Sequence, residues 1–182
     1  MNPNPNSGAE PRRDFLKGVL AGIGLAGAAA IPAAAGLRAY LSPLDQTGAN
    51  GGVWVKVTGV QTLPEDGVPR KFPVFGDRAN AWARQFNAPL GAVYLSRNAG
   101  KPPRAFNVLC PHAGCFLDYQ PARNGFYCPC HNSLFGKDGQ VNDPSSPSPR
   151  DMDELAVEIR NQNEVWVRFL NFKAGTASRI PV

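Results

Sequence analysis

Every cysteine and histidine of this chain lies in one short stretch, from Cys110 to His131. The chain has 182 residues, with 4 Cys and 2 His in total. Cys and His are common ligands of transition metals, and such confinement indicates one site rather than residues scattered through a core. Any fold of this chain must therefore bring this stretch together around a single centre.

The six residues fall into two boxes. The first reads CPHAGC and begins at Cys110, and the second reads CPCHNS and begins at Cys128. Each box offers a thiolate and an imidazole on a tight loop, so two such loops can clamp a metal centre with four ligands. The two remaining cysteines are then available for a disulfide between the loops.

Three other uses of these residues compete. A structural zinc site explains four residues but leaves two cysteines idle. Two plain disulfides leave both histidines unexplained. Covalent haem attachment is excluded, because no C-x-x-C-H occurs.

The two complete boxes, twelve residues apart, resemble the signature of the Rieske iron–sulfur family. The resemblance implies one [2Fe-2S] cluster per chain, with one iron held by Cys110 and Cys128 and the other by His112 and His131. It further implies a disulfide between the loops, which joins Cys115 to Cys130. Because neutral imidazoles replace thiolates, such a cluster has a potential between about −150 and +300 mV.

Within this family, the disulfide pair and the N-terminus are similar to those of the iron–sulfur subunit of bacterial cytochrome bc-type quinol–cytochrome c oxidoreductases. The segment Ser146–Pro149 resembles the loop that covers the cluster there, with Pro147 and Pro149 matching its prolines and Ser146 in place of the usual Gly. An ordinary surface loop is the alternative for this segment. The runner-up for the whole chain is the Rieske small subunit of an exported arsenite oxidase, which relays electrons from a molybdenum subunit.

The resemblance also assigns residues that tune the cluster. Ser133 matches a serine whose hydroxyl donates a hydrogen bond to a bridging sulfide, and Phe135 stands where high-potential members carry a Tyr. Hydrogen bonds to cluster sulfur favour the reduced state, so Phe135 predicts a lower potential, which suits menaquinol better than ubiquinol. His131 is expected to accept a hydrogen bond and a proton from quinol, with His112 similarly exposed.

The N-terminus predicts export. Arg12 and Arg13 precede Phe-Leu-Lys and an uncharged run from Gly18 to Leu37, and this order resembles a twin-arginine signal. Twenty helical residues span about 30 Å, enough to cross a bilayer. We therefore expect a cytoplasmic tail over 1–17, a single transmembrane anchor over 18–41 and a flexible linker over 42–52. Cleavage after Ala35 is the alternative.

The remainder predicts an all-β fold. Gly 19 and Pro 18 punctuate short β-rich runs, which is typical of an antiparallel sandwich. Residues 53–182 are expected to form this domain, with a small cluster-binding subdomain over about 105–150. The expected strands are Val53–Thr58, Arg70–Phe75, Val93–Arg97, Arg104–Leu109, Leu155–Arg160 and Glu164–Phe169, with a hairpin turn over 161–163 and a short helix over 77–86.

Charge excludes one class of partner. The net charge is +5, but after residue 43 only 15 basic and 12 acidic residues remain, and they are dispersed. A nucleic-acid interface needs a clustered basic face, so none is expected. The expected partners are a cytochrome b subunit, quinol and a cytochrome c-type acceptor, in a dimeric complex of a bacterial inner membrane with this domain on the periplasmic side.

Overall fold

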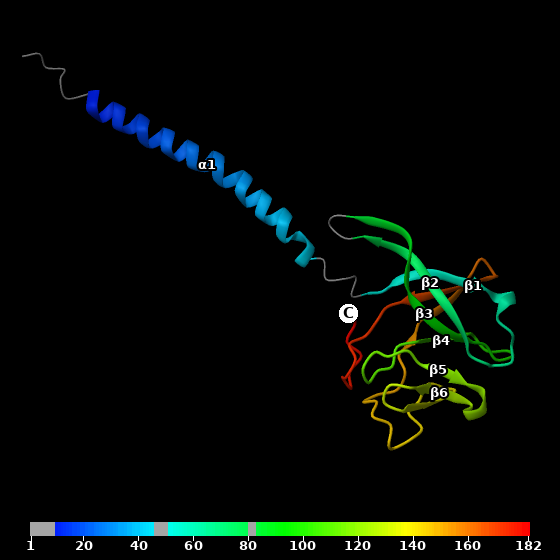
Figure 1. The fold of residues 1–182 in the computed structure, drawn as a ribbon. Coiled ribbons are helices and arrows are strands. Elements are labelled where there is room, and N and C mark those ends of the chain that lie inside the picture. Colours follow the sequence, from blue (N-terminus) through cyan, green and yellow to red (C-terminus); the bar gives the residue numbers. More distant parts are fainter. Residues whose placement is uncertain (1–9, 46–50, 80–82) are drawn as a thin grey trace, which may run out of the picture. The chain divides into compact units, whose positions relative to one another are not determined.

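The computed structural model describes residues 10–45, 51–79 and 83–182, and the chain divides into two compact units, Met1–Gln46 and Thr47–Val182. The first unit contains α1 (Glu10–Asp45), a helix of 36 residues that begins just before Arg12 and Arg13 (Figure 1). In the described part of the chain, no helix is long and apolar enough to span a bilayer. The structure therefore does not show the span expected over 18–41.

The first four residues of the predicted linker are helical. Residues 42–45 belong to α1, and residues 46–50 lie outside the described ranges. The helix continues through Pro43, which has no N–H and therefore removes one backbone hydrogen bond from the last turns of α1.

The second unit consists of antiparallel sheets, which confirms the all-β expectation. One sheet has the order β1-β10-β9 and another has the order β2-β3-β4-β8. Their strands are β1 (Val53–Gly59), β2 (Arg70–Ala79), β3 (Arg84–Ser96), β4 (Arg104–Asn107), β8 (Glu154–Leu155), β9 (Val157–Arg160) and β10 (Glu164–Phe169).

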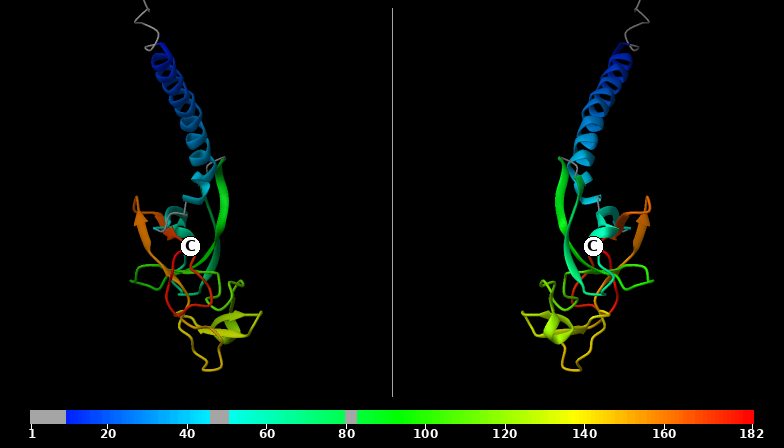
Figure 2. Two further views of the ribbon diagram at one scale, coloured as in Figure 1. Left: turned by 90° about the vertical axis from the view of Figure 1, so that its left-hand side faces the viewer. Right: turned by 90° about the vertical axis from the view of Figure 1, so that its right-hand side faces the viewer.

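A third sheet carries the second box, and the first box lies in the connection between β4 and this sheet. It has the order β5-β6-β7 and consists of β5 (Asp118–Gln120), β6 (Gly125–Cys128) and β7 (Ser133–Gly136). Two single-turn 3₁₀ helices complete the unit, η1 (Val60–Thr62) and η2 (Pro121–Arg123). Figures 1 and 2 show β5 and β6 at one end of the unit, away from β1.

The end of β3 and the adjacent β4 are buried on both faces, and strand alternation explains how. Val93 and Leu95 point into a core shared with β1 and β10, while Tyr94 between them points into a second core under the third sheet. Successive side chains of a strand face opposite sides. β4 repeats the pattern, with Ala105 in the first core and Phe106 in the second. The third sheet is therefore built directly on the back of the sandwich.

The helix expected over 77–86 is wrong. Residues 77–79 end β2 and residues 84–86 begin β3, and the register pairs Arg78 with Gln85 and Ala79 with Arg84. Residues 80–82 lie outside the described ranges. Cross-strand pairing with a long neighbouring strand overrides a weak local helix propensity.

The other strand predictions hold with changed limits. The strand expected over Leu155–Arg160 divides at Ala156, because β8 pairs with β4 whereas β9 pairs with β10. The predicted turn over 161–163 is present, and Asn161 and Gln162 both have positive φ, at 50° and 59°. Two such residues match the right-handed twist of the flanking strands.

Candidate metal centre

The first box forms a closed loop directly after β4, and we call Cys110–Cys115 loop 1. A bridge between Leu109 and Phe116 closes its base, and the Cys110 N–H donates a hydrogen bond to the Cys115 carbonyl (2.7 Å). Within the loop, the Gly114 N–H donates to the Cys110 carbonyl (2.8 Å). Gly114 has φ +76°, a conformation that side chains disfavour, which explains glycine at this point of the box.

The second box is the turn of a hairpin, and we call Cys128–Ser133 loop 2. Cys128 ends β6, Ser133 begins β7, and the two residues pair across the ladder. The Asn132 N–H donates to the Cys128 carbonyl (3.0 Å), and Asn132 adopts φ 59°. Its side-chain oxygen accepts a hydrogen bond from the Tyr127 hydroxyl (2.5 Å). Both loops thus turn back through a left-handed residue placed just before their last position.

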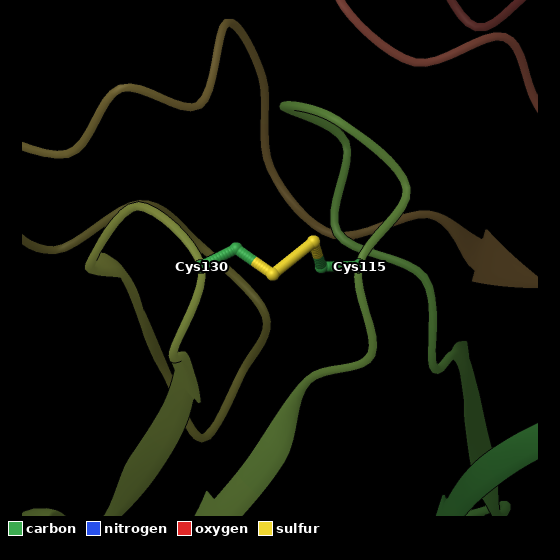
Figure 3. Close-up of a disulfide and its surroundings, with 2 residues drawn as sticks. All are labelled: Cys115 and Cys130. Carbon is green, nitrogen blue, oxygen red and sulfur yellow. A yellow bond between two sulfur atoms is a disulfide. The ribbon is translucent and has the colours of Figure 1, made fainter.

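A disulfide joins the two loops, as the resemblance implied. Cys115 and Cys130 are bonded across 15 residues of sequence, with Cα atoms 6.6 Å apart (Figure 3). The Cys128 Sγ lies within 4.8 Å of both disulfide sulfurs. Because an oxidised pair offers no thiolate, these three sulfurs do not form a ligand set, and the disulfide acts as a covalent brace beside Cys128.

The four predicted ligands come together between the loops. Cys110 and Cys128 are free thiols, each only 1% exposed. The imidazole rings of His112 and His131 lie with centroids 4.7 Å apart and planes at 88°. Each loop thus contributes one buried thiol and one imidazole, the two thiols neighbour each other and so do the two imidazoles, and their roles as ligands remain a prediction.

The two histidines differ more than expected. His131 is exposed at the tip of the hairpin, whereas His112 is half-buried and its Nδ1 is enclosed. The reason is topological, because loop 2 is a hairpin turn at the end of the third sheet, while loop 1 has chain packed against it. One imidazole is therefore presented to a partner far more openly than the other.

The polar atoms of the site fit a bound iron–sulfur cluster. Among the described residues, two buried side-chain polar atoms lack a hydrogen-bond partner, and these are His112 Nδ1 and Ser133 Oγ. Such atoms are costly to bury unless a further group satisfies them. An iron ligated by His112 Nδ1 and a sulfide accepting from Ser133 Oγ would satisfy both.

The thiols fit as well. Burial raises the pKa of the Cys110 thiol, the neighbouring Ser133 hydroxyl and His112 backbone lower it, and Cys128 raises it further. Two adjacent buried thiols resist becoming thiolates together unless a cation neutralises them. A metal centre supplies that charge.

Ser133 and Phe135 are both buried near the two thiols, and their roles in tuning the cluster remain predictions. Ser133 is fully buried beside Cys110, and Phe135 is 1% exposed in the second core together with Cys110 and Cys128. Phe135 has no hydroxyl and therefore cannot donate a hydrogen bond to a sulfur. Its side chain packs in the apolar second core.

The proline loop is attached to β7. The Ser146 hydroxyl accepts a hydrogen bond from the Leu134 N–H (3.3 Å), next to Ser133. Pro147 and Pro149 are exposed. The serine that replaces glycine thus ties this loop to the hairpin of loop 2, while its role as a cover remains a prediction. Arg12 and Arg13 belong to the other unit.

Two supporting residues escaped sequence reasoning. The buried hydroxyl of Tyr94 donates to the Leu117 carbonyl (3.0 Å) and accepts from the Tyr119 N–H (3.2 Å), which links the sandwich to the third sheet. Burial raises the pKa of Tyr94, so its hydroxyl keeps its proton. Asn107, 2% exposed, accepts from the Leu109 N–H (3.0 Å) and sets the start of loop 1. Its only sequence signal is a polar residue within an apolar strand.

Comparison with known proteins agrees with this site. Residues 53–159 match the model of the Rieske [2Fe-2S] domain, and because this is more than half of the chain, the chain belongs to that family and binds a cluster of that type. It is similar to the menaquinol:cytochrome c reductase iron-sulfur subunit of Bacillus subtilis (strain 168), with 30% identity over 82% of this chain and 87% of that relative. The subunit of the same name from Geobacillus thermodenitrificans is 28% identical, over 82% and 86%.

Among solved structures, the cyanobacterial plasma membrane Rieske protein PetC3 from Synechocystis PCC 6803 matches 63% of this chain and 99% of its own, with 25% identity and a TM-score of 0.44.

Proposed function

We propose that this chain is the iron–sulfur subunit of a quinol:cytochrome c reductase and carries electrons from quinol, with menaquinol favoured, to a cytochrome c-type acceptor. The observation that carries the proposal is the exposed imidazole of His131 at the tip of loop 2, above two buried thiols. The similarity to two menaquinol:cytochrome c reductase subunits, over most of both chains, supports the same assignment. A cytochrome b subunit and the acceptor are the implied partners, in a dimeric complex.

The chain's own residues have defined tasks in this proposal. The bound cluster supplies one-electron redox chemistry near the protein surface. With the cluster bound, the ring nitrogen of His131 that is not a ligand would, in its deprotonated form, accept a hydrogen bond from a quinol hydroxyl, and it would take the proton of that hydroxyl as the electron passes to the cluster. The disulfide and the hairpin hold this imidazole in place, because Cys130 immediately precedes His131.

Membrane attachment belongs to the proposal. The apolar side chains of α1, among them Leu20, Ile23 and Ile31, are between 64% and 73% exposed and have no protein partner among the described residues. Together with Arg12 and Arg13, they support twin-arginine export and an anchored, periplasmic domain. Replacing both arginines with lysine should leave the chain in the cytoplasm, whereas alkaline carbonate should not extract the wild-type chain from membranes. Extraction of the wild-type chain would contradict anchoring.

The decisive experiment uses the full chain isolated from membranes of its host with its bound partners. Under anaerobic conditions, menaquinol should reduce the cluster, giving a rhombic EPR signal, and b-type haem should co-purify. Ubiquinol serves as the comparison donor and tests the quinol preference. Reduction by arsenite but not by quinol, with a co-purifying molybdenum subunit, would overturn the proposal in favour of an arsenite oxidase.

A further inference from the structure

The last twelve residues of the chain form a hairpin-like segment that lies against the metal centre. We call Asn171–Val182 the C-terminal strap. The Lys173 N–H donates to the Ile180 carbonyl (2.8 Å) and the Val182 N–H to the Asn171 carbonyl (3.0 Å), which closes the strap on itself. The match to the Rieske family ends at residue 159, so the strap lies outside the part that the family describes. Figure 2 shows this segment (red) running toward the end that carries the third sheet.

The strap contacts loop 1 between two predicted ligands. The Gly175 N–H donates to the Pro111 carbonyl (2.8 Å), and Pro111 lies between Cys110 and His112. Gly175 has φ +72°, and a Cβ there would lie 3.6 Å from the His112 carbonyl oxygen. Inside loop 1 the described backbone hydrogen bonds reach only Cys110, Gly114 and Cys115. The strap therefore supplies a backbone hydrogen bond from outside the loop to the residue next to His112, in addition to the His112 backbone contact with the Cys110 thiol.

A buried ion pair fastens the strap to the segment after the proline loop. Arg150, directly after Pro149, forms two hydrogen bonds with the Asp153 carboxylate (3.0 and 2.8 Å). The two side chains are only 7% and 5% exposed. Arg150 also donates to the Thr176 carbonyl, next to Gly175. The N–H donors of a guanidinium lie in one plane and point in fixed directions. Because Arg150 donates to both Asp153 and Thr176, this one side chain sets the distance between Asp153 and the strap.

Further contacts connect the strap to the segment 150–153 and to Asn107 of β4. Arg179 of the strap donates to the Met152 carbonyl (3.0 Å) and lies 3.4 Å from the Asp153 carboxylate. The Asn107 N–H donates to the Asp153 carbonyl (2.8 Å), and the Asn107 side chain donates to the Asn171 carboxamide oxygen (2.9 Å). The strap, the segment 150–153 and the strand that leads into loop 1 thus form one network, in which the side chains of Arg150, Asp153 and Asn107 are buried and Arg179 is exposed.

We propose that the C-terminal strap is a third positioning element of the cluster site, which holds the His112 side of loop 1 through Gly175 and is kept in register with the proline loop by Arg150. Loop 2 needs no such support, because the β6–β7 ladder holds it. The proposal rests on the family of the chain and does not depend on quinol as the electron donor.

The test compares hydrogen exchange of the two loops in the full, cluster-bearing chain. Gly175→Pro removes the N–H that reaches Pro111 and cannot adopt φ +72°. Loss of one hydrogen bond should speed amide exchange in the peptide over residues 104–117 about tenfold, which corresponds to about 1.4 kcal/mol, and should leave residues 126–136 unchanged. The EPR g-values should also shift, because His112 moves relative to its iron. Gly100→Pro is the matched control, since Gly100 has φ +70° in an open turn.

A second variant addresses the link through Arg150. Arg150→Lys keeps the charge opposite Asp153 but lacks the fork that also reaches Thr176, so loop 1 exchange should rise while the melting temperature stays closer to wild type than in Arg150→Gln. A chain that ends at Phe172 lacks most of the strap and serves as a further variant. If loop 1 exchanges at the wild-type rate both in this chain and in Gly175→Pro, the proposed role of the strap is refuted. Equal acceleration in both loops would also overturn it, since that marks a global loss of stability. Native loop 1 exchange in Arg150→Lys would overturn the link.

Discussion

Removing the Ser133 hydroxyl should lower the potential of the cluster. Ser133 is fully buried, and among the described residues its Oγ has no hydrogen-bond partner. In Ser133→Ala the Oγ is lost and little else changes. If Ser133 donates to a sulfide, the reduced cluster loses more than the oxidised one, because its sulfur carries more negative charge.

The size of the effect follows from one hydrogen bond. A hydrogen bond to a charged group contributes about 1.5–3 kcal/mol, and we take the difference between the two redox states as about 1–2 kcal/mol. For a one-electron couple, about 59 mV corresponds to a tenfold change, so the potential should fall by about 40–90 mV. Redox titration followed by EPR measures this directly, and thermal unfolding of the same cluster-bearing variant is measured beside it.

The opposite result is equally well defined. If the Ser133 hydroxyl is only an unsatisfied buried group, its removal relieves a desolvation penalty of about 1–3 kcal/mol. The melting temperature would then rise and the potential would stay unchanged, and this pair of results would refute the assignment of Ser133. Ser96→Ala is the matched control, because Ser96 is also buried, at 7%, but lies in β3 of the sandwich. Its potential should equal that of the wild type.

Two further predictions concern the same site. Phe135→Tyr should raise the potential by about 40–60 mV, because the new hydroxyl donates one hydrogen bond to a ligand sulfur. Phe106→Tyr in β4 is the control and should leave the potential unchanged. If redox titration of Phe135→Tyr shows no rise, the assignment of Phe135 is wrong. Replacing both Cys115 and Cys130 with Ala opens a loop of 15 residues, which should cost about 3 kcal/mol and lower the melting temperature by about 10 °C. An unchanged melting temperature would show that the disulfide does not brace the loops.

The candidate ligands of this protein can be predicted from short stretches of sequence. Each box places its Cys and His within a few residues, and a Gly or Asn supplies the left-handed turn that closes each loop, so the candidate ligands follow from short-range sequence alone. The last strand was also predictable, because Val165, Val167 and Phe169 recur at every second position, and all three are buried.

Other features depend on partners far away in the sequence. β5 and β7 are only 3 and 4 residues long, too short to show a period, and they exist because β6 lies between them. Both described ends of the segment 77–86 are strand for the same reason, since Arg78 pairs with Gln85 and Ala79 with Arg84. Strand pairing is a property of neighbours in space, which local propensity does not record.

What the sequence by itself determined is the identity of the groups at the centre: two thiols, two imidazoles and one disulfide. Tertiary structure decided how those groups differ. Packing exposed His131 and partly enclosed His112, and it left Ser133 Oγ buried without a partner. It also brought a C-terminal segment more than 60 residues away against Pro111. The exposure of a side chain and its contacts with distant residues are set only when the chain folds. Residue type and spacing in the sequence therefore do not predict them.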